Sequence, residues 1–186
     1  MKDLTLDRLF DRLARRGTGA YGLSDVSQLD HALQSAALAA NAGLGAEFTI
    51  AALFHDVGHL VADDDVDLAA EGIDDRHEEA SADALAALFG PAVSEPVRLH
   101  VAAKRYLCGA EPDYYEILSA DSKRSLDLQG GPMSEREIKE FSAGPHFEAA
   151  IALRRIDDEA KQPGLEVPTL DTYRAMADVL AGGSSK

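Results

Sequence analysis

The sequence is poor in cysteine and in aromatic residues: it has one cysteine, Cys108, no tryptophan, and 6% aromatic residues in all. One cysteine cannot form an intrachain disulfide, and Cys108 lies outside any CxxC pair, so neither a disulfide framework nor a thiolate metal site is predicted. The chain also lacks the run of about 18 apolar residues that a membrane-spanning helix needs, and its first segment lacks the apolar stretch of a signal peptide. We therefore expect a cytoplasmic protein that does not enter a membrane.

Positive charge is scarce as well. The sequence has 18 Lys and Arg against 33 Asp and Glu, which gives a formal net charge of −15. A field of this sign repels nucleic-acid backbones and anionic lipid headgroups, so neither is an expected partner. A small anionic substrate could still bind, but only where a metal or a few Lys and Arg side chains supply local positive charge.

Hydrophobic residues make up 46% of the 186 residues, which is enough for the core of one folded domain. They recur at helical spacing, and no segment shows the alternation of a β-strand. Gly and Pro clusters divide the pattern into about seven helical segments. We predict an all-α fold that forms a single domain over residues 1–186, with an N-terminal helix within residues 1–20 and a frayed tail at residues 181–186.

Two local patterns refine this prediction. Ser134 and Glu137 have the spacing of a capping box, which predicts that a helix begins there. Residues 62–75 are acidic and poorly periodic, so we expect a loop over or beside the functional site.

Histidine is the most informative residue type in the chain. Asp56 follows His55 directly at the end of an apolar segment, and burying both side chains without partners would cost several kcal/mol. We therefore expect a metal or a hydrogen-bond network around them. His59 lies four residues after His55 and is expected on the same helix face. The histidines that helical geometry can direct inward are His31, His55, His59, His77 and His100.

Imidazole and carboxylate groups without cysteine favour iron, manganese or a similar divalent metal over a structural zinc. A carboxylate can also bridge two ions, which an imidazole cannot. Each histidine taken alone is more simply a buried or surface residue, and Asp157 alone is more simply a solvated helix charge. Their combination favours a metal site.

Two cationic residues have the spacing to lie beside these groups. Lys104 follows His100 by four residues and Arg154 precedes Asp157 by three, so each pair shares a helix face. Two cations near a metal site in an acidic protein are typical of an oxyanion clamp. The alternative for each residue is a surface salt bridge.

Four stretches carry a resemblance to a known family: YGLSDVSQLDHALQ (21–34), HVAAKRYL (100–107), LSADSKRSLDLQGGPM (118–133) and RRIDDEAKQ (154–162). With the order of His31, His55-Asp56 and Asp157, they resemble the HD-domain mixed-valence diiron oxygenases that cleave organophosphonates. The resemblance implies an HD-domain helical bundle, two irons in the Fe(II) and Fe(III) states, O2 as co-substrate and a small organophosphonate as substrate. It also implies that Asp56 bridges the irons in a ligand set of His31, His55, Asp56, His77, His100 and Asp157.

The same resemblance implies roles for residues that spacing alone would not single out. Gln28 and Ser122 match positions that contact the phosphonate together with Lys104 and Arg154. His59 matches a histidine beside the metal ligands, where it contacts substrate and takes part in catalysis. Tyr21 matches a tyrosine that caps one iron until substrate arrives.

One position departs from the family pattern. The aminophosphonate-cleaving members have a glutamate, which accepts hydrogen bonds from the substrate ammonium, where this chain has Ser24. A trimethylammonium group has no N–H to donate and is held by shape and diffuse charge. The substrate-binding position Ser24 therefore favours 1-hydroxy-2-(trimethylammonio)ethylphosphonate, which would yield glycine betaine and phosphate. Because Asp25 could supply the missing carboxylate, 2-amino-1-hydroxyethylphosphonate, giving glycine and phosphate, remains an alternative.

Two other functions are compatible with an HD-type sequence. A metal-dependent phosphohydrolase would use a metal-bound hydroxide to attack phosphorus, and it would not need His77, His100 or Tyr21. A non-catalytic HD module that regulates a partner predicts the loss of metal ligands. No ligand of the set is missing here, so this reading is the least favoured.

Overall fold

The computed structural model describes residues 5–19, 25–61 and 76–183, and these ranges contain eleven helices and no strand. The prediction of an all-α fold is confirmed. The helices are α1 (Leu6–Arg16), α2 (Gln28–Asn41), α3 (Ala46–Phe54), α4 (Gly58–Val61), α5 (His77–Phe89), α6 (Pro91–Ala110), α7 (Tyr114–Ile117), α8 (Ala120–Leu128), α9 (Glu135–Ser142), α10 (Phe147–Glu159) and α11 (Leu170–Gly183).

The prediction of about seven helices was therefore too low. Helices α4 and α7 have only four residues each, which is too short to produce an apolar period. The apolar segment around His55 also reads as one continuous helix in the sequence, whereas α3 ends at Phe54 and α4 begins at Gly58. The turn between them carries His55 and Asp56.

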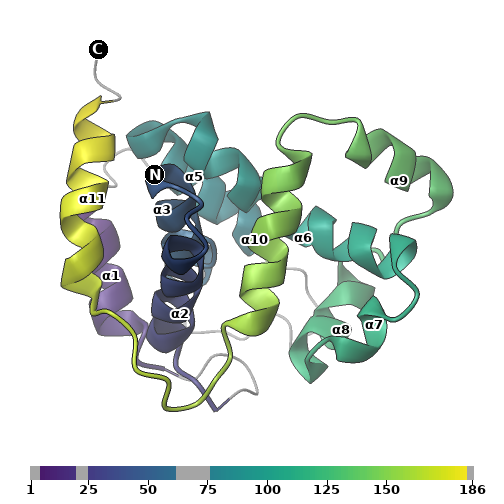
Figure 1. The fold of residues 1–186 in the computed structure, drawn as a ribbon, viewed down its shortest axis with the longest axis horizontal. Helices are drawn as coiled ribbons and strands as arrows, with labels where there is room; N and C mark the ends of the chain where they lie inside the picture. Colours follow the sequence, from purple (N-terminus) through teal and green to yellow (C-terminus); the bar gives the residue numbers. More distant parts are fainter. Residues whose placement is uncertain (1–4, 20–24, 62–75, 184–186) are drawn as a thin grey trace.

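The helices are arranged around α10 and α6, which pack against each other (Figure 1). Helix α10 also contacts α2 and α3, and α5 packs along α6. Helices α1 and α11 lie together at one end of the molecule in Figure 1, and α7, α8 and α9 lie at the other end. The residues predicted as metal ligands are therefore carried by α2, α5, α6 and α10 and by the turn after α3.

Two groups of buried apolar side chains hold this arrangement. The larger joins α1 to α6 with α10 and α11, and its centre is α3, in which Ile50, Leu53 and Phe54 are completely or almost completely buried. The smaller group is Leu107, Tyr114, Leu118 and Leu126, between α6, α7 and α8. Burial of a side chain of this size contributes about 1.5–3 kcal/mol to the stability of the fold. Packing of α3 therefore fixes the position of the turn that follows it.

Capping boxes fix where two of the described helices begin. Ser134 and Glu137 form the predicted capping box at the start of α9. Ser27 and Asp30 form a second box at the start of α2, which places His31 just after the first turn of that helix. The box thus sets the position of a site residue.

Gly58 allows two helices to approach each other closely. A Cβ atom added there would lie 2.1 Å from the backbone oxygen of His77, so any larger residue would push α4 and α5 apart. The Gly58 N–H also donates a 2.7 Å hydrogen bond to Ser81 Oγ on α5. These contacts hold the turn with Asp56 close to the beginning of α5.

The predicted boundaries meet the structure in part. Helix α1 lies within the segment predicted as an N-terminal helix, and α11 remains helical through Gly183, three residues into the predicted frayed tail. The predicted acidic loop, residues 62–75, is outside the described residues. The single-domain organisation over residues 1–186 remains a prediction.

Candidate metal centre

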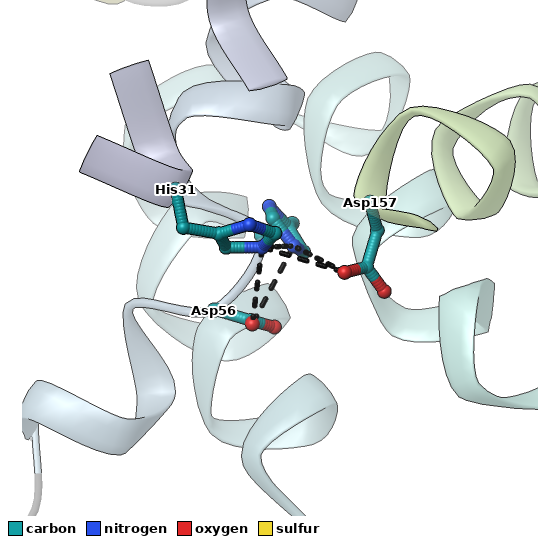
Figure 2. Close-up of side chains that lie close together, drawn as sticks. His31, Asp56 and Asp157 are labelled. Carbon is teal, nitrogen blue, oxygen red and sulfur yellow. Dashed lines mark hydrogen bonds and ion pairs between the residues drawn. The ribbon is translucent and has the colours of Figure 1, made fainter. Parts of the chain in front are cut away.

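Three distant parts of the chain bring together a first group of side chains that could hold a metal ion: His31 from α2, His55 and Asp56 after α3, and Asp157 from α10. All four are buried. His31 Nε2 lies 3.4 Å from Asp157 Oδ1 and 3.7 Å from Asp56 Oδ2. Figure 2 shows His31, Asp56 and Asp157 turned toward one another.

A second group forms on the other side of Asp56. His77, the first residue of α5, and His100, within α6, place their Nε2 atoms 3.5 Å and 3.6 Å from Asp56 Oδ1. The two oxygens of Asp56 therefore face different groups, because Oδ2 faces His31 and His55. This is the arrangement that a carboxylate bridging two cations requires.

The backbone sets the proton positions on three of these imidazoles. The Nδ1 atoms of His31, His55 and His100 lie 2.8, 2.9 and 2.7 Å from the carbonyl oxygens of Ala160, Ala52 and Val97, respectively. A carbonyl oxygen can only accept a hydrogen bond, so Nδ1 carries the proton and Nε2 presents its lone pair to the centre.

The separations between Nε2 atoms test whether this donor set fits a metal. His31 Nε2 and His55 Nε2 are 3.2 Å apart, and His77 Nε2 and His100 Nε2 are 3.3 Å apart. The lone pairs of His31 and His55, facing each other at this distance, repel unless a cation lies between them. Two nitrogens about 2.1 Å from one ion and at right angles would be about 3.0 Å apart, so both pairs fit a shared metal.

The electrostatic environment keeps two of the donors, His100 and Asp56, in the forms that bind metals. Burial lowers the pKa of His100 to about 3, so this imidazole is neutral at pH 7. Burial alone would raise the pKa of Asp56, but the neighbouring His55 and His77 hold that pKa well below its usual value. The site therefore presents a neutral imidazole and an ionised carboxylate.

His59 differs from its predicted position. It does not share a helix face with His55, because α3 ends at Phe54 and His59 belongs to α4. It is exposed, and its ring stacks on that of His77 with centroids 4.0 Å apart and planes at 21°. Its ligand atom lies within 4.8 Å of those of Asp56 and His77, so His59 forms the outer edge of the second group.

The two predicted cations are buried beside the first group, and each is only 3% exposed. Arg154 Nη1 lies 2.7 Å from Asp157 Oδ2, and Arg154 Nη2 donates a 3.2 Å hydrogen bond to Ser122 Oγ. Lys104 Nζ donates a 2.7 Å hydrogen bond to Ser125 Oγ. Burial, together with the charge of Arg154, lowers the pKa of Lys104 to about 7. These groups therefore form a buried basic cluster, and the surface salt-bridge alternative is wrong for both cations.

Sequence reasoning missed three residues at this cluster. Tyr114 accepts a 3.0 Å hydrogen bond from Arg154 Nε, and Asp158 pairs with the same guanidinium. Lys161 Nζ lies 3.2 Å from Asp157 Oδ1. The four-residue spacing of Lys161 from Asp157 could have indicated it, whereas Tyr114 is forty positions away from Arg154 and no spacing connects the two.

Three predicted site residues remain: Gln28 lies beside Asp56, and Tyr21 and Ser24 are not among the described residues. Gln28 Nε2 donates a 3.1 Å hydrogen bond to the Asp56 backbone oxygen, which places its side chain at the centre. Tyr21 and Ser24 fall outside the described residues, so their predicted roles are not tested by the structure.

Comparison with known proteins agrees with this geometry. Residues 29–138 match the HD domain family. The chain is 46% identical to hydroxymethylphosphonate dioxygenase of Gimesia maris over 168 residues, which cover 89% of this chain and 82% of the relative. The chain belongs to the HD-domain phosphonate oxygenase family. This oxygenase is also 39% identical over 160 residues to the glycine-betaine-forming [1-hydroxy-2-(trimethylamino)ethyl]phosphonate dioxygenase of Leisingera caerulea, covering 86% of this chain and 80% of the relative.

A third relative of this oxygenase is an uncharacterised protein of Acanthamoeba polyphaga mimivirus, 34% identical over 151 residues, which cover 80% of this chain and 68% of that protein. None of the described helices of the oxygenase is long and apolar enough to cross a membrane.

Proposed function

We propose that this oxygenase holds two irons and uses O2 to break the carbon–phosphorus bond of a 1-hydroxyphosphonate. The observation that carries the proposal is the pair of imidazole groups that share Asp56. The irons would supply O2 activation and coordination of the substrate oxygens. The proposed ligands are those of the sequence analysis, namely His31, His55, Asp56, His77, His100 and Asp157.

The chain's own residues bind and orient the substrate. Lys104 and Arg154 would hold the phosphonate through charge-assisted hydrogen bonds, with Ser122 as a neutral contact. Gln28 would contact the substrate from the side of Asp56. Tyr21 would cap one iron until substrate arrives, and His59 would act at the second group, where it already stacks on the His77 ring.

Neither proposed substrate carries an N–H group. Ser24 supplies no carboxylate for a primary ammonium. The names of the two relatives with a stated activity also contain no primary amine substrate. The 39% identical relative supports 1-hydroxy-2-(trimethylammonio)ethylphosphonate, which would give glycine betaine and phosphate. The 46% identical relative supports hydroxymethylphosphonate as a second candidate. With one O2, hydroxymethylphosphonate would balance to formate and phosphate.

Three substrates compared side by side test this proposal. Anaerobically purified protein should contain about two irons per chain, and O2 consumption should match phosphate release on the trimethylammonio or hydroxymethyl substrate. We expect a lower kcat/KM for 2-amino-1-hydroxyethylphosphonate, and Ser24→Glu should raise its relative rate by supplying an acceptor. A wild-type preference for the primary amine would show that Asp25 or another acceptor binds the ammonium.

A phosphohydrolase activity on a nucleotide or another phosphoester is the competing function. It needs no O2, so the decisive measurement is phosphate release under strict anaerobiosis. Release that persists without O2, or a single tightly bound zinc in active protein, would contradict the oxygenase proposal.

A further inference from the structure

Gln34 is a buried polar residue that no proposed catalytic role uses. It lies on α2, three residues after His31, and is only 1% exposed. Its Nε2 donates a 2.8 Å hydrogen bond to the Gln162 backbone oxygen, and its Oε1 accepts a 2.9 Å hydrogen bond from the Gln162 backbone N–H. One side chain therefore satisfies both backbone groups of a residue 128 positions away.

Those two bonds act on the segment that orients His31. Helix α10 ends at Glu159, and the Ala160 carbonyl turns out of the helix to accept the His31 Nδ1–H at 2.8 Å. Gln162 lies two residues further along. Because Gln34 and His31 are one turn apart on α2, both ends of this short connection are tied to the same helix.

We infer that Gln34 is a positioning residue for His31. By holding residues 160–162 against α2, it keeps the Ala160 carbonyl aimed at Nδ1, which fixes the proton there and directs the Nε2 lone pair into the centre. It also fixes the end of α10, which carries Asp157 one turn earlier. This inference rests on the proposed metal centre only for its effect on metal binding, since the effect on the His31 proton needs no metal.

Thr49 provides a matched control. It is also 1% exposed, and its hydroxyl donates one 2.8 Å hydrogen bond to a backbone oxygen, that of Gly45, within its own helix start. Thr49→Val therefore removes a buried side-chain-to-backbone bond of the same kind without touching the connection to His31. Gln34→Met keeps the length of the glutamine side chain and removes both of its bonds.

The first measurement is made without metal. In ¹⁵N-resolved NMR spectra of apoprotein, the wild type should show slowly exchanging Nδ1 protons on His31, His55 and His100. Gln34→Met should broaden or remove the His31 signal alone, and Thr49→Val should leave all three. A His31 signal in Gln34→Met that exchanges as slowly as in the wild type would overturn the inference.

The second measurement is metal affinity, taken from competition with a chelator using zinc or iron. Loss of a partner that orients a ligating histidine typically weakens binding by about 10–100-fold, and we expect this for Gln34→Met but not for Thr49→Val. If Gln34→Met does not fold, Gln34→Glu retains the shape and the acceptor for the Gln162 N–H, and it should show a smaller effect of the same sign. Equal metal affinity in the wild type and in the folded Gln34 variant, whichever of the two is used, would show that Gln34 is a purely structural residue.

Discussion

The two halves of the candidate centre are built differently. The inner half, His31, His55 and Asp157, is buried among helices of the main core, and backbone carbonyls fix both of its imidazoles. In the outer half, His77 is the first residue of α5, its side chain is 12% exposed, and its Nδ1 faces the Glu78 carboxylate at 3.8 Å.

The difference teaches which half is preorganised by the fold. The inner imidazoles are oriented by the ends of α3 and α10, so their geometry follows from packing of the core. In the outer half, the Val97 carbonyl orients His100 in the same way, but His77 depends on the start of α5, which lies against Gly58, and on the stacked ring of His59. We therefore expect the inner half to bind a metal more tightly and the outer half to exchange its metal more readily.

The largest expected effect comes from breaking the connection between the halves. Among the proposed ligands, Asp56 is the only residue that faces both imidazole groups. Asp56→Ala should therefore reduce turnover to background and lower the metal content to less than about one ion per chain. Metal analysis and O2 consumption check this result. Asp83→Ala, on an exposed ion pair with Arg98, is the control and should behave as wild type. Full turnover by the Asp56 variant would contradict the shared centre.

The comparison of the halves is tested directly by His31→Ala against His77→Ala. His31 is fully buried, so its truncation should leave a cavity, lower the free energy of unfolding by about 2–4 kcal/mol and remove metal from both positions. His77→Ala should cost less stability and leave the inner metal bound. Chemical denaturation and metal analysis measure both effects. Equal losses in the two variants would show that the halves are not built in this hierarchy.

The basic cluster lies beside the inner half and should act on substrate binding. Lys104→Ala and Arg154→Ala should each lose about 1.5–3 kcal/mol of binding or transition-state stabilisation, which is roughly 10–150-fold in kcat/KM. Arg154→Ala should also lower metal content, because its guanidinium pairs with Asp157. Steady-state kinetics with Arg155→Ala as control check this, since Arg155 is exposed and pairs with Glu111. Unchanged kinetics in both variants would remove these residues from the phosphonate site.

Gly58→Ala tests the close contact between α4 and the start of α5, which positions His77 in the outer half. The added methyl group would collide with the His77 backbone oxygen, so we expect a loss of about 1–3 kcal/mol in the free energy of unfolding and a weaker outer metal. Gly182→Ala is the matched control, because an added Cβ there meets nothing within 4 Å, and it should be neutral or slightly stabilising. Normal metal content in a folded Gly58→Ala protein would show that the separation of α4 and α5 does not matter.

Much of this centre was predictable from the sequence, and the part that was not has a physical cause. The all-α class followed from apolar spacing, and Arg154 beside Asp157 followed from helical geometry, because both depend on neighbours in the sequence. His59 was misplaced because the helix breaks at His55, and nothing in the apolar pattern indicates that break. Gln34 and Tyr114 were missed because their partners, Gln162 and Arg154, are distant in the sequence and only the packing of α2, α7 and α10 brings them together.

The smallest expected effect separates the stability of the basic cluster from its function. The folded-state pKa of Lys104 is about 7, below its value of roughly 10.4 in an unfolded chain, so the unfolded state binds more protons between these pH values. The free energy of unfolding should therefore rise with pH in this window, and below pH 7 the full cost of the buried charge is present.

Lys104→Met removes that cost. At pH 7 the variant without substrate should be more stable than wild type by about 1–3 kcal/mol, after allowance for the lost bond to Ser125, although it binds phosphonate less well. Chemical denaturation at pH 7 and pH 9 measures the effect, and the advantage should shrink at the higher pH because wild-type Lys104 is then neutral. Arg155→Met should show no such trend, since its guanidinium stays charged throughout this range. An advantage of the Lys104 variant that does not change with pH would show that the gain comes from packing rather than from removal of the charge.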